Sequence, residues 1–133
     1  MNVITYGTFD TLHYGHIILL NHLKELTQGT GKLFVGVSTD TFNLQKNKIA
    51  YQPYSCRANL LLSLRAVDFV FPEECWEQKI KDIEKYNIDI FAIGNDWEGK
   101  FDFLNDYCKV IYLPRTPNIS STKIRKITSQ SNS

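Results

Sequence analysis

The chain has 133 residues, a composition that is 43% hydrophobic and 22% charged, and a formal net charge of +1. A chain of this length usually forms one domain that is stable without disulfides or a structural metal. The nearly balanced charge argues against a protein that binds nucleic acid through bulk positive charge or that carries an acidic tail.

Segments with strand and helix patterns alternate along the chain. The first four are a strand at 3–6, a helix from about 13 to 27, a strand at 32–38 and a helix at 55–67. They are followed by a strand at 68–71 that Pro72 stops, a helix at 74–86, a strand at 88–93, a short helix at 101–107, a strand at 109–113 and a last helix at 121–128. Residues 39–52 show little periodicity and are predicted to form a loop, and the polar tail 129–133 is predicted to be disordered.

Several of the expected strands are continuous apolar runs, such as KLFVGVS at 32–38. Such strands are typical of a parallel sheet that helices cover on both faces. We therefore predict an α/β fold, a single Rossmann-like domain over residues 1–133 with a parallel five-stranded sheet. Folds of this kind bind ligands at the carboxyl ends of the strands, where the polar segment GTFDTLHYGH at 7–16 is expected.

The cysteines and the N-terminal sequence favour a cytoplasmic protein. The three cysteines form no C-x-x-C pair, so we expect reduced thiols rather than disulfides or a zinc site. The chain begins with a strand pattern rather than with the charged and apolar regions of a signal peptide. No apolar run approaches the roughly 18 residues that span a membrane, so we expect no membrane partner.

His13 and His16 lie three residues apart where the first strand gives way to a helix. At this spacing both side chains point to the same side of a helix. The N–H groups at a helix N-terminus attract anions, and Gly15 leaves room for a ligand beside the backbone. The pattern favours a phosphate site in which two imidazoles stabilise a phosphorus-centred transition state. The alternatives are one buried and one surface histidine, or a metal-binding pair.

A second candidate phosphate site lies near the C-terminus, in the sequence RTPNISSTKIR at 115–125. This segment combines cationic side chains and three consecutive hydroxyl groups at an expected loop-to-helix junction, a combination that suits a polyphosphate. Ser120 or Ser121 can also act simply as the cap of the last helix.

The H-x-G-H motif and the motif R-T-x-x-I-S-S-T-x-I-R together resemble the cytidylyltransferases of the nucleotidyltransferase superfamily. The segments VITYGTFD, STDTFNLQK, WEQK, DWEGKFDFL and VIYLPRTP extend this resemblance to the bacterial glycerol-3-phosphate cytidylyltransferases, over residues 2–126. The H-x-G-H motif alone is shared with adenylyltransferases and class I aminoacyl-tRNA synthetases, whereas the full combination is highly specific.

The resemblance implies the transfer of a cytidylyl group from CTP to sn-glycerol 3-phosphate, which gives CDP-glycerol and pyrophosphate. The acceptor phosphate would attack the α-phosphorus of CTP directly, without a covalent enzyme intermediate and without a general base. Positioning and electrostatics carry most of such catalysis. The resemblance also implies Mg²⁺ held mainly by the CTP phosphates, a homodimer, and use of the product for teichoic acid or capsule polymers.

Position in the family motifs assigns roles to individual residues. The catalytic residues are expected to be His13, His16, Lys48 and Arg115. The CTP-binding residues are expected to be Thr8, Phe9, His13, Tyr14, Gly15, His16, Lys48, Asp96, Arg115, Thr116, Pro117, Asn118, Ile119, Ser120, Ser121 and Thr122. The residues expected to bind the acceptor are Lys46, Arg57 and Lys79, and Asp10 is expected to brace the loop.

Several alternatives stay open. The same chemistry with phosphoethanolamine or phosphocholine as acceptor is one, and a catalytically silent nucleotide-binding module is another. Lys79 can lie on a solvated helix face, and Trp97 and Phe101 can pack in the core rather than stack on a base. Three features depart from the family pattern, namely Asn95 before the D-W-E-G run, a longer loop at 27–31, and Ser121 in place of Thr in the I-S-x-T turn, which keeps the hydroxyl.

Overall fold

A computed structural model describes residues 1–114 of the chain. Its centre is a sheet of five strands, β1 (Val3–Gly7), β2 (Leu33–Ser38), β3 (Phe69–Glu73), β4 (Ile90–Gly94) and β5 (Lys109–Leu113). All neighbouring strands are parallel, and they lie in the order β3-β2-β1-β4-β5. The predicted five-stranded parallel sheet is confirmed. This order reverses the direction of the winding between β1 and β4, the point where such folds bind ligands.

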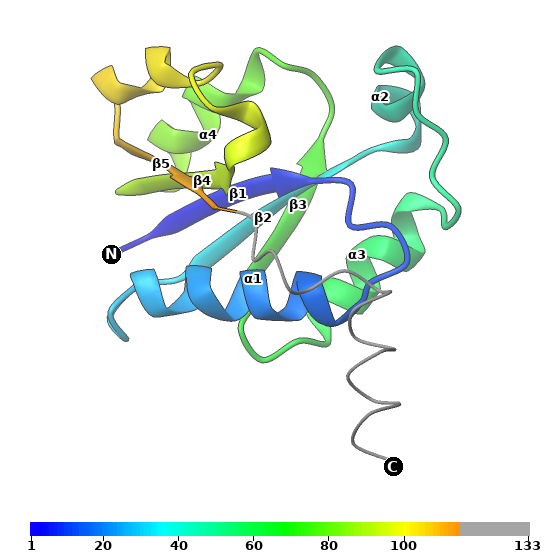
Figure 1. The fold of residues 1–133 in the computed structure, drawn as a ribbon, viewed down its shortest axis with the longest axis horizontal. Coiled ribbons are helices and arrows are strands. Elements are labelled where there is room, and N and C mark those ends of the chain that lie inside the picture. The colour runs from blue at the N-terminus through cyan, green and yellow to red at the C-terminus, as the bar shows by residue number, and fades with distance from the viewer. Residues whose placement is uncertain (115–133) are drawn as a thin grey trace.

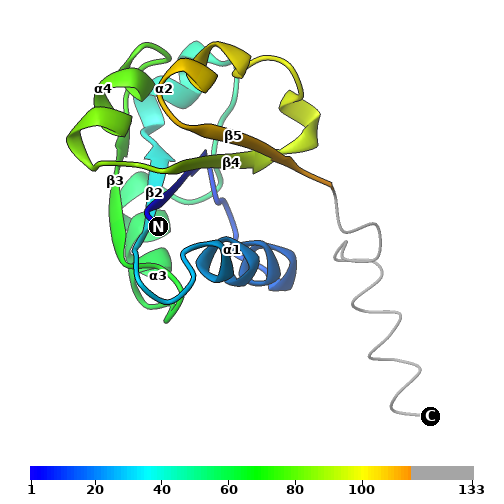
Figure 2. The same ribbon diagram turned by 90° about the vertical axis from the view of Figure 1, so that its left-hand side faces the viewer.

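Helices cover both faces of the sheet, as predicted (Figure 1 and Figure 2). One face carries α1 (Tyr14–Leu26) and α3 (Tyr54–Leu62), and the other carries α4 (Gln78–Lys85) and the 3₁₀-helix η2 (Asp102–Asp106). Two short elements, α2 (Asp40–Gln45) and the 3₁₀-helix η1 (Asn95–Trp97), follow β2 and β4 directly. They extend the fold beyond the carboxyl ends of the strands.

Two apolar layers hold the sheet between its helices. Successive residues of a strand point to opposite faces, so Val3 belongs to one layer and Ile4 to the other. Leu23 of α1 and Leu61 of α3 complete the first layer, and Ile83 of α4 belongs to the second. Burial on both faces explains why the strand sequences are continuously apolar rather than alternating.

The strand β3 extends through Pro72 to Glu73, beyond the end predicted from the sequence. The carbonyl oxygen of Glu73 accepts a hydrogen bond from the backbone N–H of Thr39, which follows β2. The carbonyl oxygen of Pro72 instead accepts a hydrogen bond from the side-chain amide of Gln78, on the side of β3 that has no neighbouring strand. The backbone of Pro72 therefore faces away from the sheet, and the edge position of β3 tolerates its missing N–H group.

Two further elements differ from the prediction. The segment 39–52 begins with the helix α2, because Thr39 caps it by accepting the N–H of Phe42 on its hydroxyl (3.1 Å). The helix predicted at 55–67 ends at Leu62, and the next residues turn so that Ala66 and Val67 enter the first apolar layer. The helix and tail expected at 121–133 lie outside the described residues.

Candidate active site

A cavity of about 420 Å³ opens at the carboxyl ends of the strands. The register between β1 and β4 covers their first residues, Val3 with Ile90 and Ile4 with Phe91, so the two strands separate toward this end. The loop after β1 supplies one wall, the lysines after α2 a second, and the residues that follow β3 and β4 the rest. The fold thus creates the cavity at its switch point.

His13 and His16 cap the start of α1 with their own imidazoles. His13 Nδ1 accepts the backbone N–H of Gly15 (3.0 Å), and the backbone N–H of His13 donates to His16 Nδ1 (3.2 Å). The two rings stack with their centroids 3.9 Å apart, and both line the cavity. Because each Nδ1 is an acceptor, the neutral imidazoles carry their protons on Nε2. Each histidine therefore keeps an Nε2–H donor for a ligand.

The pKa of His16 is lowered to about 4, because burial and the neighbouring His13 disfavour the charged imidazolium. The carboxylate of Asp10 opposes this shift in part. The ring of Phe9 packs against His16 with the centroids 5.6 Å apart. His16 is therefore neutral at pH 7, and it meets an anion as a hydrogen-bond donor rather than as a cation.

The loop between β1 and α1 has an unusual backbone. Phe9 and Thr11 have φ values of 50° and 46°, in the left-handed region that non-glycine residues rarely adopt. Asp10, between them, accepts the backbone N–H groups of Tyr51 (2.6 Å) and Gln52 (3.0 Å). These two bonds, that from Tyr51 above all, lower the pKa of Asp10. Asp10 thus ties the histidine loop to the segment after α2, as expected of a bracing residue.

A chain of polar contacts links two lysines in the cavity. Lys46 donates to Ser38 Oγ (2.9 Å), and Ser38 donates in turn to Glu73 Oε1 (2.9 Å). Glu73 Oε2 forms an ion pair with Lys79 (2.6 Å), in which the two side chains are only 4% and 2% exposed. Burial lowers the pKa of Lys46, and the carboxylate of Glu73 opposes that shift. Two ammonium groups around one carboxylate leave a net positive charge for an anion.

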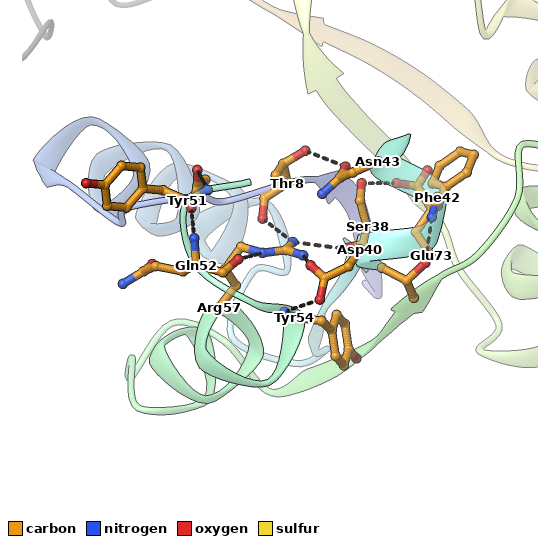
Figure 3. A network of polar contacts seen from close by, with 12 residues as sticks. Thr8, Ser38, Asp40, Phe42, Asn43, Tyr51, Gln52, Tyr54, Arg57 and Glu73 are labelled. Atoms are coloured by element: carbon orange, nitrogen blue, oxygen red, sulfur yellow. Dashed lines mark hydrogen bonds and ion pairs between the residues drawn. The ribbon is translucent and has the colours of Figure 1, made fainter. Parts of the chain in front are cut away.

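Arg57 is fully buried and is not among the residues that line the cavity, and its guanidinium joins a network of polar contacts (Figure 3). Its guanidinium donates to the carbonyl oxygens of Thr8 (2.9 Å) and Ser38 (2.7 Å), where β1 and β2 end. It also donates to the carbonyl oxygen of Gln52 (2.9 Å) and forms an ion pair with Asp40 (2.8 Å). These contacts are those of a residue that fixes the cavity walls in place.

The structure brings together most of the predicted site residues that lie within residues 1–114. Those that line the cavity are Thr8, Phe9, His13, His16, Lys46, Lys48 and Lys79. The predicted site residues within 1–114 that do not line the cavity are Tyr14, Gly15, Arg57 and Asp96. Lys79 is buried rather than on a solvated helix face. Residues 115–122, which include Arg115 and the predicted phosphate-binding turn, lie outside the described residues, so their roles stay predictions.

Sequence reasoning missed Glu73, which pairs with Lys79 inside the cavity. The expectation that Pro72 ends its strand put Glu73 in a loop, whereas it is the last residue of β3. A carboxylate at the end of a parallel strand is the signal that would have found it. Trp97 and Phe101 pack with the second apolar layer, which was one of the two alternatives considered for them, and they also line the cavity.

The carboxylates in the cavity are already engaged with protein donors. Asp10 accepts two backbone N–H groups, and Glu73 accepts from Ser38 and Lys79. Among residues 1–114, no group of three His, Cys, Asp or Glu side chains is placed to hold a metal ion. The same part of the chain has no helix with the length and apolar character needed to cross a membrane.

A histidine pair at the first helix of a Rossmann-like sheet, beside a lysine-rich cavity, is the architecture of a nucleotidyltransferase domain. Residues 4–127 match the family model described as cytidylyltransferase-like, and the chain belongs to this family.

Two curated relatives of this chain carry the same name. The glycerol-3-phosphate cytidylyltransferase of Bacillus subtilis (strain 168) is 58% identical over 124 residues, which cover 93% of this chain and 94% of that protein. The protein of the same name from Staphylococcus aureus (strain NCTC 8325 / PS 47) is 53% identical and covers 93% of this chain and 92% of its own. The resemblance found in the sequence is confirmed.

A solved structure supports the fold. The lipopolysaccharide core biosynthesis protein from Thermoplasma volcanium GSS1 superposes with a TM-score of 0.72 at 25% identity. The superposition covers 86% of this chain and 97% of that chain.

Proposed function

We propose that this chain transfers a cytidylyl group from CTP to sn-glycerol 3-phosphate and releases pyrophosphate and CDP-glycerol. The observation that carries the proposal is the stacked histidine pair, whose Nε2–H donors share one cavity with three lysines. Identities of 53–58% to proteins named for this reaction support the choice of nucleotide and acceptor.

An oxygen of the acceptor phosphate forms a bond to the α-phosphorus of CTP, and the bond from that phosphorus to the oxygen of the leaving pyrophosphate breaks. Both reactants are anions, so the protein has to offset their repulsion and the charge that develops on the leaving group. His16 donates a neutral hydrogen bond to this charge, and the exposed Lys48 adds a cation at the rim of the cavity. The phosphate dianion is itself the nucleophile, so the step needs no general base.

The acceptor phosphate is assigned to the side of the cavity that holds Lys46 and Lys79. Ser38 and Glu73 hold these two ammonium groups in place before a ligand arrives, which reduces the ordering that binding requires. By resemblance to the family, Arg115 and residues 116–122 are assigned to the triphosphate. Mg²⁺ carried by the CTP phosphates supplies further charge neutralisation.

Pyrophosphate release tests the proposal directly. The chain is incubated with CTP and Mg²⁺ and with glycerol 3-phosphate, phosphocholine or phosphoethanolamine, and ATP serves as the control nucleotide. We expect release with CTP and glycerol 3-phosphate, its loss on chelation of Mg²⁺ and its return when Mg²⁺ is added. Release with another acceptor would keep the chemistry and discard the glycerol assignment. No release with any acceptor would favour a silent nucleotide-binding module.

We further propose a cytoplasmic homodimer, which rests on the resemblance to the family. Light scattering on the purified protein tests the oligomeric state. A dimer has twice the 15.4 kDa of one chain, and a measured mass of 15.4 kDa at micromolar concentration would contradict it.

A further inference from the structure

Asn43 joins two walls of the cavity from a buried position on α2. Its side chain accepts the hydroxyl of Thr8, in the loop after β1, on Oδ1 (3.3 Å; Figure 3). Its carbonyl oxygen accepts the backbone N–H groups of Lys46 (3.0 Å) and Lys48 (2.8 Å). All three of these partners line the cavity, whereas Asn43 is not among the lining residues and is only 1% exposed. Asn43 therefore contacts three cavity residues without facing the cavity itself.

The amide of Asn43 is incompletely paired. Among residues 1–114, its Nδ2 atom is a buried side-chain nitrogen that has no hydrogen-bond partner. A buried donor without a partner destabilises a fold, and such groups are rare in proteins. The contact between Oδ1 and the Thr8 hydroxyl is also longer than the roughly 2.5–3.0 Å of a well-formed O–H···O hydrogen bond. The rest of the described chain therefore satisfies this amide poorly.

The hydroxyl of Thr8 has to change its partner when it binds an anion. It now donates its single proton to Asn43, so it presents only lone pairs to the cavity. Phosphate oxygens accept hydrogen bonds, and a contact with one of them requires Thr8 to donate. The backbone of Thr8 stays in place meanwhile, because its carbonyl oxygen accepts from the buried Arg57 (2.9 Å). The group that has to adjust is therefore the amide of Asn43.

A half-turn of the Asn43 amide satisfies both groups. The oxygen and NH₂ ends of an amide are close in size, so they exchange places without repacking. After the turn, Nδ2–H donates to Thr8 Oγ1, and the Thr8 proton points into the cavity. The donor that had no partner is then paired, and the group left over is a carbonyl oxygen, which tolerates incomplete pairing better than an N–H group does. Hydrogen bonds in such a chain also strengthen one another.

We propose that Asn43 is a positioning residue that turns the Thr8 hydroxyl toward the triphosphate of CTP. The inference rests on the proposed function, in which Thr8 belongs to the CTP site, and it adds that the contact goes to a phosphate oxygen. Asn43 touches neither substrate and acts through Thr8. Binding of the triphosphate and the half-turn of the amide are coupled, and the unpaired donor is the cost in stability of that coupling.

The variant Asn43→Leu tests whether the amide serves binding or folding. Leucine has a similar shape without polar atoms, and the backbone hydrogen bonds to Lys46 and Lys48 do not depend on the side chain. We expect the Kd for CTP from titration calorimetry to rise about three- to tenfold. The Tm should not fall, because the variant no longer buries an unpaired donor. A lower Tm with an unchanged Kd would overturn the inference.

The matched control is Asn21→Leu, the same exchange at an exposed position of α1. This variant should bind CTP as the wild type does. If Asn43→Leu does not fold, Asn43→Ala takes its place in every comparison, since it also removes the amide.

A double-mutant cycle tests whether Asn43 acts through Thr8. Thr8→Val removes the hydroxyl and keeps the shape of the side chain. In a Thr8→Val background, Asn43→Leu should raise the Kd for CTP by less than about twofold, against three- to tenfold in the wild type, because the relay is already broken. Equal fold increases in the two backgrounds would show that the residues act independently and would overturn the inference.

Nuclear magnetic resonance observes the amide itself. The side-chain NH₂ signals of Asn43 are assigned by their loss in Asn43→Leu. One Nδ2 proton should move downfield when CTP or inorganic tripolyphosphate binds, because it enters a hydrogen bond, and should not move when cytidine is added. The absence of a shift in protein saturated with CTP, or the same shift with cytidine, would contradict the coupling to phosphate.

These measurements separate the inference from the proposed function, because they need binding and no turnover. If CTP binds but no cytidylyl group reaches glycerol 3-phosphate, the proposed function fails and the double-mutant cycle still decides the inference. If CDP-glycerol is formed and the effects of Thr8→Val and Asn43→Leu on the Kd for CTP are additive, the proposed function stands and the inference is overturned.

Discussion

The backbone N–H of His13 donates to the Nδ1 atom of His16, and the two imidazoles stack 3.9 Å apart at the first turn of α1. One histidine thereby fixes the tautomer and the ring orientation of the other. A helix start that usually uses Ser, Thr, Asp or Asn as its cap uses a histidine here. The cap and the proposed phosphate site are therefore the same pair of side chains.

The protonation of His16 is the first prediction. Its imidazole should stay neutral with the proton on Nε2 from pH 8 down to about pH 5, and titrate near pH 4. Long-range ¹H–¹⁵N correlation spectra, assigned with a His16→Gln variant, measure both the tautomer and the pKa. A His16 signal that titrates near the ordinary value of 6.5 would contradict the burial argument.

The same shift makes stability depend on pH. The folded pKa of about 4 lies below the ordinary 6.5, so between these values the unfolded chain binds a proton that the folded chain does not. The free energy of unfolding should therefore fall as the pH is lowered from 6.5 to 4. Urea denaturation across this range should show a shallower fall for His16→Gln than for the wild type.

Replacement of His16 by alanine should lower turnover by about two to three orders of magnitude, the usual cost of losing a donor to a transition state. CTP binding should survive in part, because the other phosphate contacts remain. The control is His22→Ala, an exposed histidine further along α1 that is not among the residues lining the cavity. Turnover of His16→Ala within threefold of the wild type would remove His16 from the mechanism.

The strands and their surroundings could be predicted because their signals are local. Apolar runs such as 33–38 indicate strands that are buried on both faces. The spacing of His13 and His16 indicates that both side chains lie on the same side of the first helix turn. The capping geometry of these histidines could not be predicted, because it depends on ring orientation. The contacts of Arg57 could not be predicted either, because its partners come from three separate segments of the chain.

Glu73 was missed for a different physical reason. Proline usually ends a strand because it lacks a donor, and whether that loss matters depends on which side of the strand has a partner. Position at the sheet edge follows from the strand order, which is a property of the whole chain. The short α2 was missed because six residues are too few for a clear apolar period.

The buried guanidinium of Arg57 predicts a large loss of stability on truncation. Arg57→Met should lower the free energy of unfolding by about 3–5 kcal/mol, because it leaves the carbonyl oxygens of Thr8 and Ser38 buried without a donor and breaks the pair with Asp40. Arg65→Met, at an exposed position, should change it by less than about 0.5 kcal/mol. Chemical denaturation of both variants makes the comparison, and similar values would refute a structural role.

The position of Lys46 predicts that this lysine contributes more to binding of the acceptor than to binding of CTP. Its half-buried ammonium is held toward the acceptor side by Ser38 (2.9 Å), whereas Lys48 is exposed at the rim. Lys46→Ala should therefore raise the KM for glycerol 3-phosphate more than the KM for CTP. Steady-state kinetics with each substrate varied in turn measure the two KM values. Equal increases in both would contradict the assignment of Lys46 to the acceptor.

Gly36 in the middle of β2 offers a test of how tightly the floor of the cavity is packed. A Cβ atom at this position would lie 2.5 Å from Cδ1 of Tyr6 and 3.0 Å from the ring of Phe71. The ring of Tyr6 cannot easily yield, because its hydroxyl donates to Asp82 (2.7 Å). Gly36→Ala should therefore lower the free energy of unfolding by about 1–3 kcal/mol, the usual cost of overpacking a core.

The matched control for this prediction is Gly94→Ala, where a Cβ atom would have no heavy atom within 4 Å. That variant should stay within about 0.5 kcal/mol of the wild type in the same denaturation experiment. Because the ring of Tyr6 also packs against the ammonium of Lys79 at 4.5 Å, Gly36→Ala should in addition raise the KM for the acceptor. A Gly36→Ala variant as stable as Gly94→Ala would show that the ring of Tyr6 moves freely and that the floor of the cavity is not tightly packed.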